Sequence, residues 1–188
     1  MKNIILFLPV FFFGSVCMAQ GVFSNQTNYT LEKVVQDYPS QFKNIRGELL
    51  STTPGSAEYK STITIPGAVS STITQFAIAH KQMLSWQSVV YSGTTFSAAK
   101  NRFEELFNQI KNTIIKPEGE KAVIVNGLYR DPSEDKTFNT IQFDLMPATG
   151  LMQKVNIDLK LEKTGTQWEI ILSVSDKERK EMESLTIK

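Results

Sequence analysis

Two segments of the chain place apolar residues at helical spacing. The first carries Leu31, Val34, Val35, Tyr38, Phe42 and Ile45. Because a recurrence of i, i+3, i+4 and i+7 buries one side of a helix, this pattern predicts a helix that begins after Thr30, its expected N-cap. Pro39 lacks a backbone N–H donor, so we expect a kink, or two short helices that meet near Tyr38.

The second segment runs from Phe96 to Ile114 and has the cleaner helical pattern. Its apolar side carries Phe96, Ala99, Phe103, Leu106, Phe107, Ile110 and Ile114. The opposite side is polar and includes Lys100 and Glu104 at i, i+4. We expect Thr95 to cap this helix.

The rest of the chain alternates between apolar and polar residues, as strands do. The predicted strands span 58–65, 72–79 and 84–92 in the first half, and 121–130, 137–145, 152–162 and 167–175 in the second. Short turns rich in Pro, Gly and polar residues separate them. Such links favour antiparallel hairpins.

The two halves repeat one order of elements. With a constant offset of 65 residues, the apolar side of the first helix aligns with that of the second, and FKNIR aligns with FNQIK. Trp86 and Trp168, the two tryptophans, each lie near the start of the last predicted strand of their half. These matches indicate duplication of a helix followed by three or four strands. The alternative is that any two amphipathic helices align in this way, because periodicity sets apolar residues against apolar ones.

The pattern therefore predicts an α+β fold with two tandem helix-plus-antiparallel-strands units, 30–93 and 94–175. Both helices would pack on one face of one extended sheet or of two abutting sheets. The expected core includes Phe42, Ile45, Phe103, Phe107, Ile110, Phe143 and Trp168. The other face would be open, with polar strand segments such as 58–62 and 72–75 suited to contacting a protein or a glycan. The charged segment 176–188 is expected to be a short exposed helix or a tail.

Residues 1–19 have the pattern of a secretory signal peptide. Lys2 precedes an apolar run from Ile4 to Phe13, and small residues lead to an expected cleavage site after Ala19. The run is too short to remain as a membrane anchor, so no transmembrane segment is expected in the mature chain. We expect an exported protein, periplasmic or extracellular, that begins at Gln20.

Two alternatives concern this N-terminal region. Cys17 could carry a lipid, although Gly14 and Val16 depart from the usual lipoprotein pattern.

The polar segment 20–29 is interpreted as a flexible leader and contains Asn-x-Thr sequons at Asn25 and Asn28. They would be glycosylation acceptors in a eukaryote, but the short Phe-rich signal is more typical of bacteria, where they are polar linker residues.

Charge and cysteine content exclude several functions. Removing Lys2 from the 20 basic residues leaves 19, which equals the 19 acidic residues, and the signal also holds the one cysteine. A mature chain without a basic stripe is not expected to bind nucleic acid. Without cysteine it has no thiol or disulfide chemistry, and no residue pattern calls for a metal or another cofactor.

Two polar features could carry chemistry. His80 is the one histidine and falls in a predicted turn, so it is interpreted as an exposed turn residue, with a catalytic role as the alternative. The loop at 131–135 groups three carboxylates, which could hold calcium, but it lacks the ligand spacing of an EF-hand and equally fits an acidic hairpin turn. No motif specifies a catalytic residue.

Three aromatic residues are the candidate ligand-binding side chains: Trp86, Tyr91 and Trp168. Exported proteins can bind glycans or partner chains through exposed aromatic rings. The alternative is that tryptophans at matching places of two repeats are core residues.

The duplicated helix-plus-antiparallel-sheet unit resembles, in architecture, the tandem units of the β-lactamase inhibitor proteins. Stretches such as QFKNIRGEL and LSWQS resemble uncharacterised secreted bacterial proteins. The resemblance implies no activity and transfers no functional residue, because function depends on sites rather than folds.

The leading functional hypothesis is an exported, non-catalytic binding or envelope-associated module, with an envelope protein or a glycan as its partner. A secreted hydrolase with an unrecognised site and a structural periplasmic protein are the alternatives. The absence of catalytic motifs and the polar strand segments favour the first.

Overall fold

The computed structural model describes residues 21–78 and 81–178. The expected signal peptide, His80 and most of the charged C-terminal segment lie outside the described residues.

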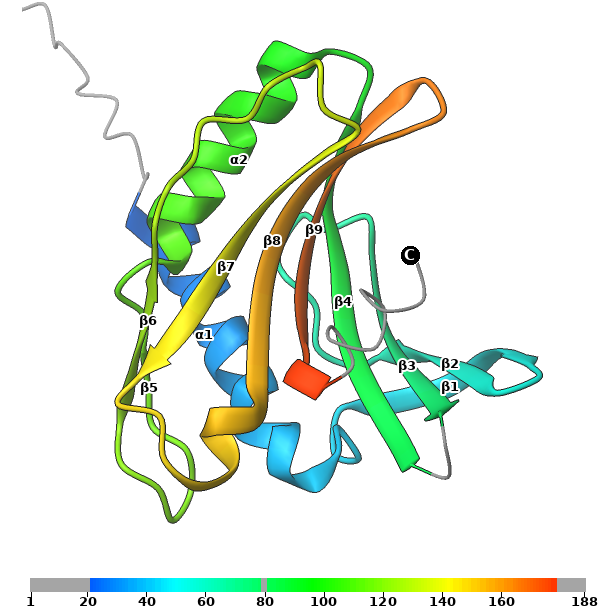
Figure 1. Cartoon of the computed structure of the whole chain (residues 1–188), viewed down its shortest axis with the longest axis vertical. Coiled ribbons are helices and arrows are strands. Elements are labelled where there is room, and N and C mark those ends of the chain that lie inside the picture. The colour runs from blue at the N-terminus through cyan, green and yellow to red at the C-terminus, as the bar shows by residue number, and fades with distance from the viewer. Residues whose placement is uncertain (1–20, 79–80, 179–188) are drawn as a thin grey trace, which may run out of the picture.

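The described strands form one antiparallel sheet of nine strands in the order β1-β2-β3-β4-β9-β8-β7-β6-β5. Their bounds are β1 Arg46–Thr53, β2 Ser56–Ser61, β3 Ser70–Ile78, β4 Lys81–Gly93, β5 Ile114–Ile115, β6 Val123–Gly127, β7 Phe138–Met146, β8 Val155–Thr164 and β9 Gln167–Asp176. Each half of the chain is a meander, and pairing of β4 with β9 joins the two halves into one continuous sheet (Figure 1). The α+β class and the antiparallel pairing predicted from the sequence are thus confirmed.

The first helix, α1, spans Gly21–Asp37 and is longer than the sequence pattern predicts. The expected flexible leader is helical from Gly21, and Thr30 lies inside the helix rather than at its N-cap. Thr27 and Thr30 are buried with Leu31 and Val34, so they extend the buried side by one turn. Hydropathy alone missed this turn because it counts threonine as polar, although its methyl group can pack in a core.

The predicted break at Pro39 is present. The helix α1 ends at Asp37, and the 3₁₀ helix η1, Tyr38–Ser40, follows with Pro39 in its first turn. Asp37 also stabilises the turn that follows η1. Its carboxylate accepts hydrogen bonds from the backbone N–H of Asn44 at 3.1 Å and from the Asn44 side chain. Phe42 and Ile45 reach the core from this turn rather than from a helix.

The second helix, α2, spans Phe96–Ile110 and ends before the predicted Ile114. The backbone leaves the helix at Lys111, whose ψ is 136°. Asn112 follows with a φ of 68°, and its N–H donates to the Val125 carbonyl at 2.8 Å. Ile114 and Ile115 therefore form the short edge strand β5. Thr95 occupies the N-cap position, but its side chain makes no capping hydrogen bond.

The edge strand β1 was missed by the strand pattern. Leu49 and Leu50 are adjacent and both about half exposed, so this strand does not alternate between buried and exposed residues. Register shifts on both sides of Leu49 explain the irregular pattern.

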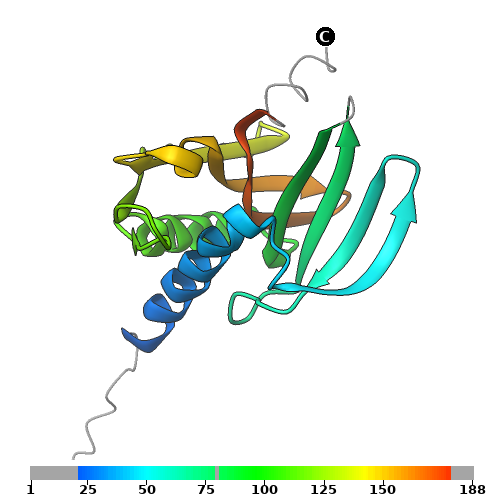
Figure 2. The ribbon, with the colours of Figure 1, turned by 90° about the horizontal axis from the view of Figure 1, so that it is seen from below.

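The core lies between α2 and the sheet. Phe96 packs on Trp168 with ring centroids 4.9 Å apart, and Phe107 stacks on Phe143 at 5.7 Å. The helix α1 contacts α2 and β5, and Figure 2 shows the two helices side by side. All seven core residues predicted from the sequence are buried.

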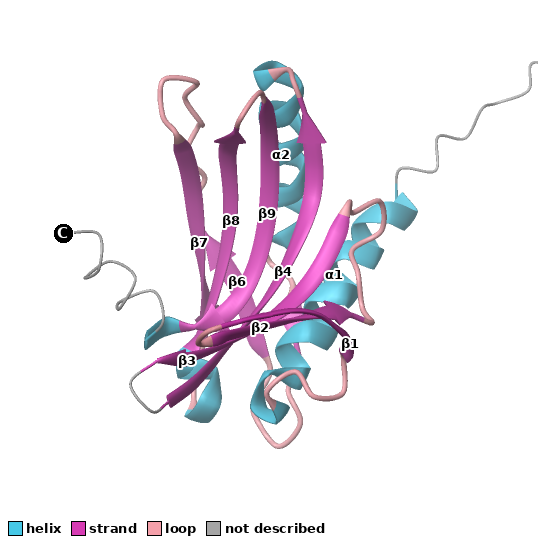
Figure 3. Cartoon of the chain, turned by 90° about the vertical axis from the view of Figure 1, so that its right-hand side faces the viewer, coloured by secondary structure: helices cyan, strands magenta, loops and turns pink. Residues whose placement is uncertain are grey.

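The strands β7, β8, β9 and β4 present their other face away from α2 (Figure 3). On β8 the residues Ile157, Leu159 and Leu161 are fully buried toward the core. Side chains alternate along a strand, so Asn156, Asp158 and Lys160 lie on the opposite face. This polar face holds the candidate site.

Candidate functional site

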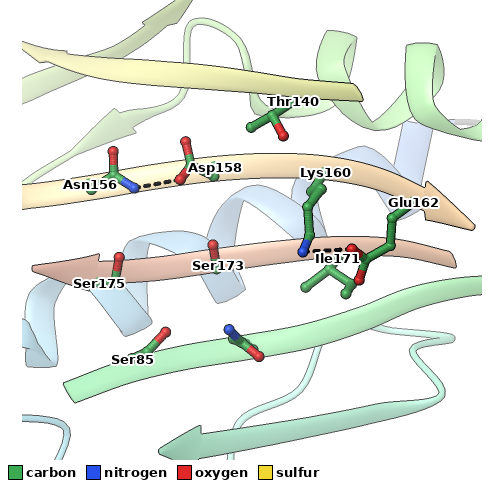
Figure 4. A pocket seen from close by; sticks show the side chains of 10 residues that line it. Ser85, Thr140, Asn156, Asp158, Lys160, Glu162, Ile171, Ser173 and Ser175 are labelled. Carbon is green, nitrogen blue, oxygen red and sulfur yellow. Dashed lines mark hydrogen bonds and ion pairs between the residues drawn. The ribbon is translucent and has the colours of Figure 1, made fainter. Parts of the chain in front are cut away.

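A hollow of about 310 Å³ lies on the open face of the sheet, over β4, β9, β8 and β7. We call it the polar groove. It is lined by Ser85, Gln87, Thr140, Asn156, Asp158, Lys160, Glu162, Ile171, Ser173 and Ser175 (Figure 4). Nine of these ten residues are polar or charged, and no aromatic ring is among them.

Strand register arranges these side chains in rows across the sheet. Ser85 pairs with Ser175, and Ser175 pairs with Asn156, which defines the Ser85 row. The next row contains Gln87, Ser173 and Asp158. Since directly paired residues have Cβ atoms about 5 Å apart, the side chains of one row can contact a single small ligand.

Two atoms of the Ser85 row are buried without a hydrogen-bond partner among the described residues: Ser85 Oγ and Asn156 Oδ1. Ser85 is 0% exposed and Asn156 is 1% exposed, so both residues lie at the base of the polar groove. A buried polar atom left unsatisfied costs about 1–3 kcal/mol. Three other buried atoms among the described residues also lack a partner, Asn28 Oδ1, Arg46 Nε and Gln109 Oε1, but none of these residues lines the polar groove. The Ser85 row is distinguished because it brings two such atoms into one hollow, where a bound group could satisfy them.

The orientation of the Asn156 amide is fixed by its neighbour. Asn156 Nδ2 donates to the Asp158 carboxylate at 2.6 Å. An ionised carboxylate only accepts hydrogen bonds, so the amide N–H₂ must face Asp158. The carbonyl oxygen of Asn156 is left as the acceptor that lacks a partner.

The other end of the groove differs in chemistry. Lys160 Nζ and Glu162 form an ion pair with a separation of 2.7 Å. Ile171, the one apolar lining residue, pairs with Lys160 in the β8–β9 ladder, and Thr140 pairs with Lys160 from β7. The groove thus runs from a neutral, hydroxyl-rich end to an apolar patch beside an ion pair.

The candidate aromatic residues lie elsewhere. Trp86 is 0% exposed, and its indole Nε1 donates to Ser61 Oγ at 3.0 Å. Trp168 is 2% exposed between Phe96 and the ammonium group of Lys163. Tyr91 is half-buried and packs against the core. None of the three lines the polar groove.

One predicted polar segment adjoins the groove. Thr72 pairs with Gln87 and Thr74 pairs with Ser85, so β3 extends both rows. Sequence reasoning missed the groove residues themselves, because serine, asparagine and lysine alternating with apolar residues read as an ordinary solvated strand face. The alternation in NIDLKLE and ILSVSD was the available signal.

One of the three carboxylates of the acidic loop, that of Asp131, is paired with a lysine of α2. Asp131 accepts a hydrogen bond from Lys100 Nζ at 2.6 Å, and Tyr129 OH lies 3.4 Å from the same carboxylate. Ser133 and Asn139 close the loop with two hydrogen bonds. Within residues 21–78 and 81–178, no three His, Cys, Asp or Glu side chains are grouped as metal ligands would be.

A second hollow, of about 210 Å³, lies between η1 and the start of β4. Tyr38 OH donates to Asp176 at 3.1 Å at its edge, and burial together with the Asp176 charge raises the pKa of Tyr38. Lys81 and Glu178 form an ion pair nearby. The named polar groups of this hollow are therefore already paired, unlike those of the Ser85 row.

No helix among the described residues is both long and apolar enough to cross a membrane. Comparison of the chain with protein-family models, curated proteins and solved structures found no match, so the geometry of the polar groove stands as the guide to function.

Proposed function

We propose that this protein is an exported, non-catalytic binding module that holds a small polar ligand in the polar groove. The observation that carries the proposal is the pair of unsatisfied buried atoms, Ser85 Oγ and Asn156 Oδ1, in one row of one groove. A ligand that bonds to both would remove two desolvation penalties at once.

The size and lining of the groove favour a small molecule over a glycan chain. A hollow of about 310 Å³ falls at the lower end of the range typical of small-molecule sites, about 300–1,000 Å³. Glycan sites gain much of their affinity from stacking on aromatic rings, and no aromatic residue lines this groove. The groove itself therefore supports a small ligand.

The arrangement of carboxylates disfavours the hydrolase alternative. Asp158 and Glu162 are four residues apart on β8, a separation of about 13 Å along the strand. Paired catalytic carboxylates in glycoside hydrolases are about 5–9.5 Å apart. Glu162 is also engaged by Lys160, which leaves no acid–base pair in the groove.

The structural alternative explains the groove less well. In a protein that binds no ligand, two unsatisfied buried atoms only lower stability. Apolar side chains at these two positions, like those on the other face of the same strands, would avoid that loss. Binding sites often retain residues that lower the stability of the fold, because those residues serve the ligand.

Export and tandem duplication complete the proposal. Export is supported by the signal pattern of residues 1–19.

Duplication is supported by the pairing register of β4 with β9. Val89 of β4 pairs with Ile171 of β9. Trp86 lies three residues before Val89, and Trp168 lies three residues before Ile171. A two-fold axis through that pair would exchange the tryptophans and match β3 with β8 and β2 with β7. The duplication would be contradicted if superposition of β2–β4 on β7–β9 left the two tryptophans on different faces of the sheet.

Equilibrium dialysis tests the binding function. The chain from Gln20 to Lys188 would be dialysed against a small-molecule extract of its own source, and retained compounds identified by mass spectrometry. We expect enrichment that Asn156→Ala abolishes and Asn126→Ala, an exposed asparagine on β6, leaves unchanged. Equal retention by both variants, or none by the unmodified protein, would refute binding in the groove.

A further inference from the structure

We propose that β7 carries a second binding site, an edge slot that takes an extended, acidic peptide segment of another protein as an added strand. The edge slot is the space between residues 138–141 of β7 and the connection 128–137, which joins β6 to β7. It lies along the backbone edge of β7, whereas the polar groove lies over the open face of the sheet. The inference therefore does not rest on the proposed function.

The first step is the direction of the backbone groups in β6 and β7. Val125 of β6 bonds away from β7, because its carbonyl accepts from the Asn112 N–H at 2.8 Å and its N–H donates to the Thr113 carbonyl at 2.9 Å. The direction alternates along a strand, so the neighbouring Asn126 faces β7, where it is paired with Asp144. The even-numbered residues of β7 therefore direct their N–H and C=O groups toward β6.

Two of these even-numbered residues, Phe138 and Thr140, lie beyond the end of β6 at Gly127. The odd-numbered residues face β8, as the bond from the Lys163 N–H to the Thr137 carbonyl at 3.1 Å shows. Neither ladder of β7 contains a register shift, so the alternation holds along the strand. Within the described part of the chain, no strand pairs with Phe138 or Thr140 on the side of β6. Both residues thus offer a donor and an acceptor to an added strand.

The second step is the space along this edge. A hollow of about 540 Å³ lies against residues 138–141, and one of about 280 Å³ lies against Thr140 and Ile141. Arg130 of the connection lines both hollows. Four or five residues of a strand are about 13–17 Å long, which matches this stretch of β7.

The space is open because α2, not β7, holds the connection. Tyr129 packs on Phe107 of α2 with ring centroids 5.1 Å apart, and Asp131 pairs with Lys100 of α2 at 2.6 Å. In Figure 1 the connection from β6 accordingly runs beside α2 before it returns to β7. These contacts keep the chain from continuing β6 along β7.

The third step is the chemistry of the lining. Phe103 of α2 and Ile141 are buried side chains that line the larger hollow, so they offer an apolar floor. Phe138 lines the same hollow and is 60% exposed. Side chains of an added strand alternate between the two faces, so those directed toward α2 should be apolar.

Charge then selects an acidic segment. Four ionisable side chains line the larger hollow: Arg130, Lys136, Asp131 and Asp135. Asp131 is paired with Lys100, whereas Arg130 and Lys136 form no ion pair with any described residue. Counting Lys100, the slot has a net charge of +1, and Arg130 is the one ionisable residue of the smaller hollow. Glutamate or aspartate in the added strand is therefore favoured over lysine.

Hydrogen exchange of the ¹⁵N-labelled mature chain tests whether the edge is open. Neighbouring residues of one strand provide the comparison. The amides of Phe138 and Thr140 should exchange at least about tenfold faster than those of Asn139 and Ile141, which bond to β8.

Two matched peptides then test the partner. One is an acetylated hexapeptide of alternating valine and glutamate, and the other has lysine in place of glutamate. We expect the glutamate peptide to bind about fivefold more tightly in a chemical-shift titration, the factor that one exposed ion pair can contribute. At saturation it should slow the exchange of the Phe138 and Thr140 amides to the rates of their neighbours.

The direction of the added strand can be tested with the same peptide. If it continues β6, its residues that bond to Thr140 place their side chains on the same face as Thr140, and its valines lie toward α2. N-methylation of the glutamates should therefore abolish binding, and N-methylation of the valines should not. Arg130→Glu should reverse the preference between the two peptides, whereas Lys43→Glu, at an exposed lysine outside the slot, should leave it unchanged. Retained peak dispersion shows that each variant is folded.

Four results would overturn the proposal. Slow exchange of the Phe138 and Thr140 amides in the dilute free chain would mean that the edge is already covered. Exchange that slows as the protein concentration rises would assign the edge to a second copy of this chain. If neither peptide shifts the amides of residues 138–141, the slot is no peptide site, and equal affinity for both peptides would refute the acidic partner.

Discussion

Ser85 and Ser88 lie three residues apart on β4, on opposite faces of the sheet, and both are fully buried. Ser88 Oγ accepts a hydrogen bond from Ser71 Oγ at 2.9 Å and donates to the Ser70 carbonyl at 3.3 Å. Ser85 Oγ has no partner among the described residues. One strand thus carries a serine that supports the fold and a serine that is left unsatisfied in the groove.

The two serines should therefore differ in how replacement by alanine changes the free energy of unfolding. Ser88→Ala should lower the free energy of unfolding by about 1–2 kcal/mol, because the buried hydrogen bonds of Ser88 with the Ser71 hydroxyl and the Ser70 carbonyl are lost. Ser85→Ala should change it by less than about 0.5 kcal/mol or raise it, because no hydrogen bond is lost. Urea unfolding of both variants in ligand-free buffer measures the two values. Equal losses would mean that Ser85 is satisfied within the protein.

The two tryptophans should also differ in their contribution to stability. Trp86→Phe removes the hydrogen bond from the indole to Ser61 as well as core volume, and should cost about 2–4 kcal/mol. Trp168→Phe keeps a ring against Phe96 and should cost less, because no indole hydrogen bond is lost among the described residues. Chemical denaturation compares them. A variant that kept full stability but lost a partner would instead place that tryptophan in a binding surface.

Tyr129 should make unfolding pH-dependent at high pH. Burial, followed by the nearby charges of Glu104 and Asp131, raises the pKa of Tyr129 to about 12. The native state then holds a proton that the unfolded state releases near pH 10, so this contribution is complete below pH 10 and is lost as the pH rises toward about 12. Unfolding curves of the wild type and Tyr129→Phe between pH 9 and 12 isolate this effect. Parallel pH profiles would contradict the assignment.

Export predicts a defined N-terminus. Protein recovered from outside the cytoplasm of its source should begin at Gln20, with no lipid attached, because Ala19 ends the expected signal peptide. N-terminal sequencing and intact mass determine this directly. A mature chain that begins at a lipid-modified Cys17 would support the membrane-tethered alternative, and an uncleaved chain in the cytoplasm would refute export.

The fold was predictable where one physical signal dominated. Helix α2 has a strong apolar side, and its buried residues Phe103 and Phe107 follow directly from 3.6-residue periodicity. Its end was not predictable in this way, because the chain leaves the helix at Lys111 and Asn112 then donates to the backbone of β6, a strand whose position periodicity does not show. Strand β1 was missed because an irregular edge strand need not alternate.

The candidate site was predictable only as a polar face. Alternation places Asn156 and Asp158 opposite the buried side of β8, but it cannot show which strands lie beside each other. The Ser85 row exists because β9 lies between β4 and β8, an order that joins the two halves of the chain. The aromatic candidates were chosen by residue type, and the structure places Trp86 and Trp168 among buried side chains.

A high-resolution crystal structure of the mature protein, after dialysis against a small-molecule extract of its source, tests the central claim most directly. We expect electron density for a bound organic molecule with atoms about 2.7–3.2 Å from both Ser85 Oγ and Asn156 Oδ1. Ordered water alone at both atoms, in crystals whose groove is open to solvent, would contradict the claim that the polar groove is a ligand-binding site.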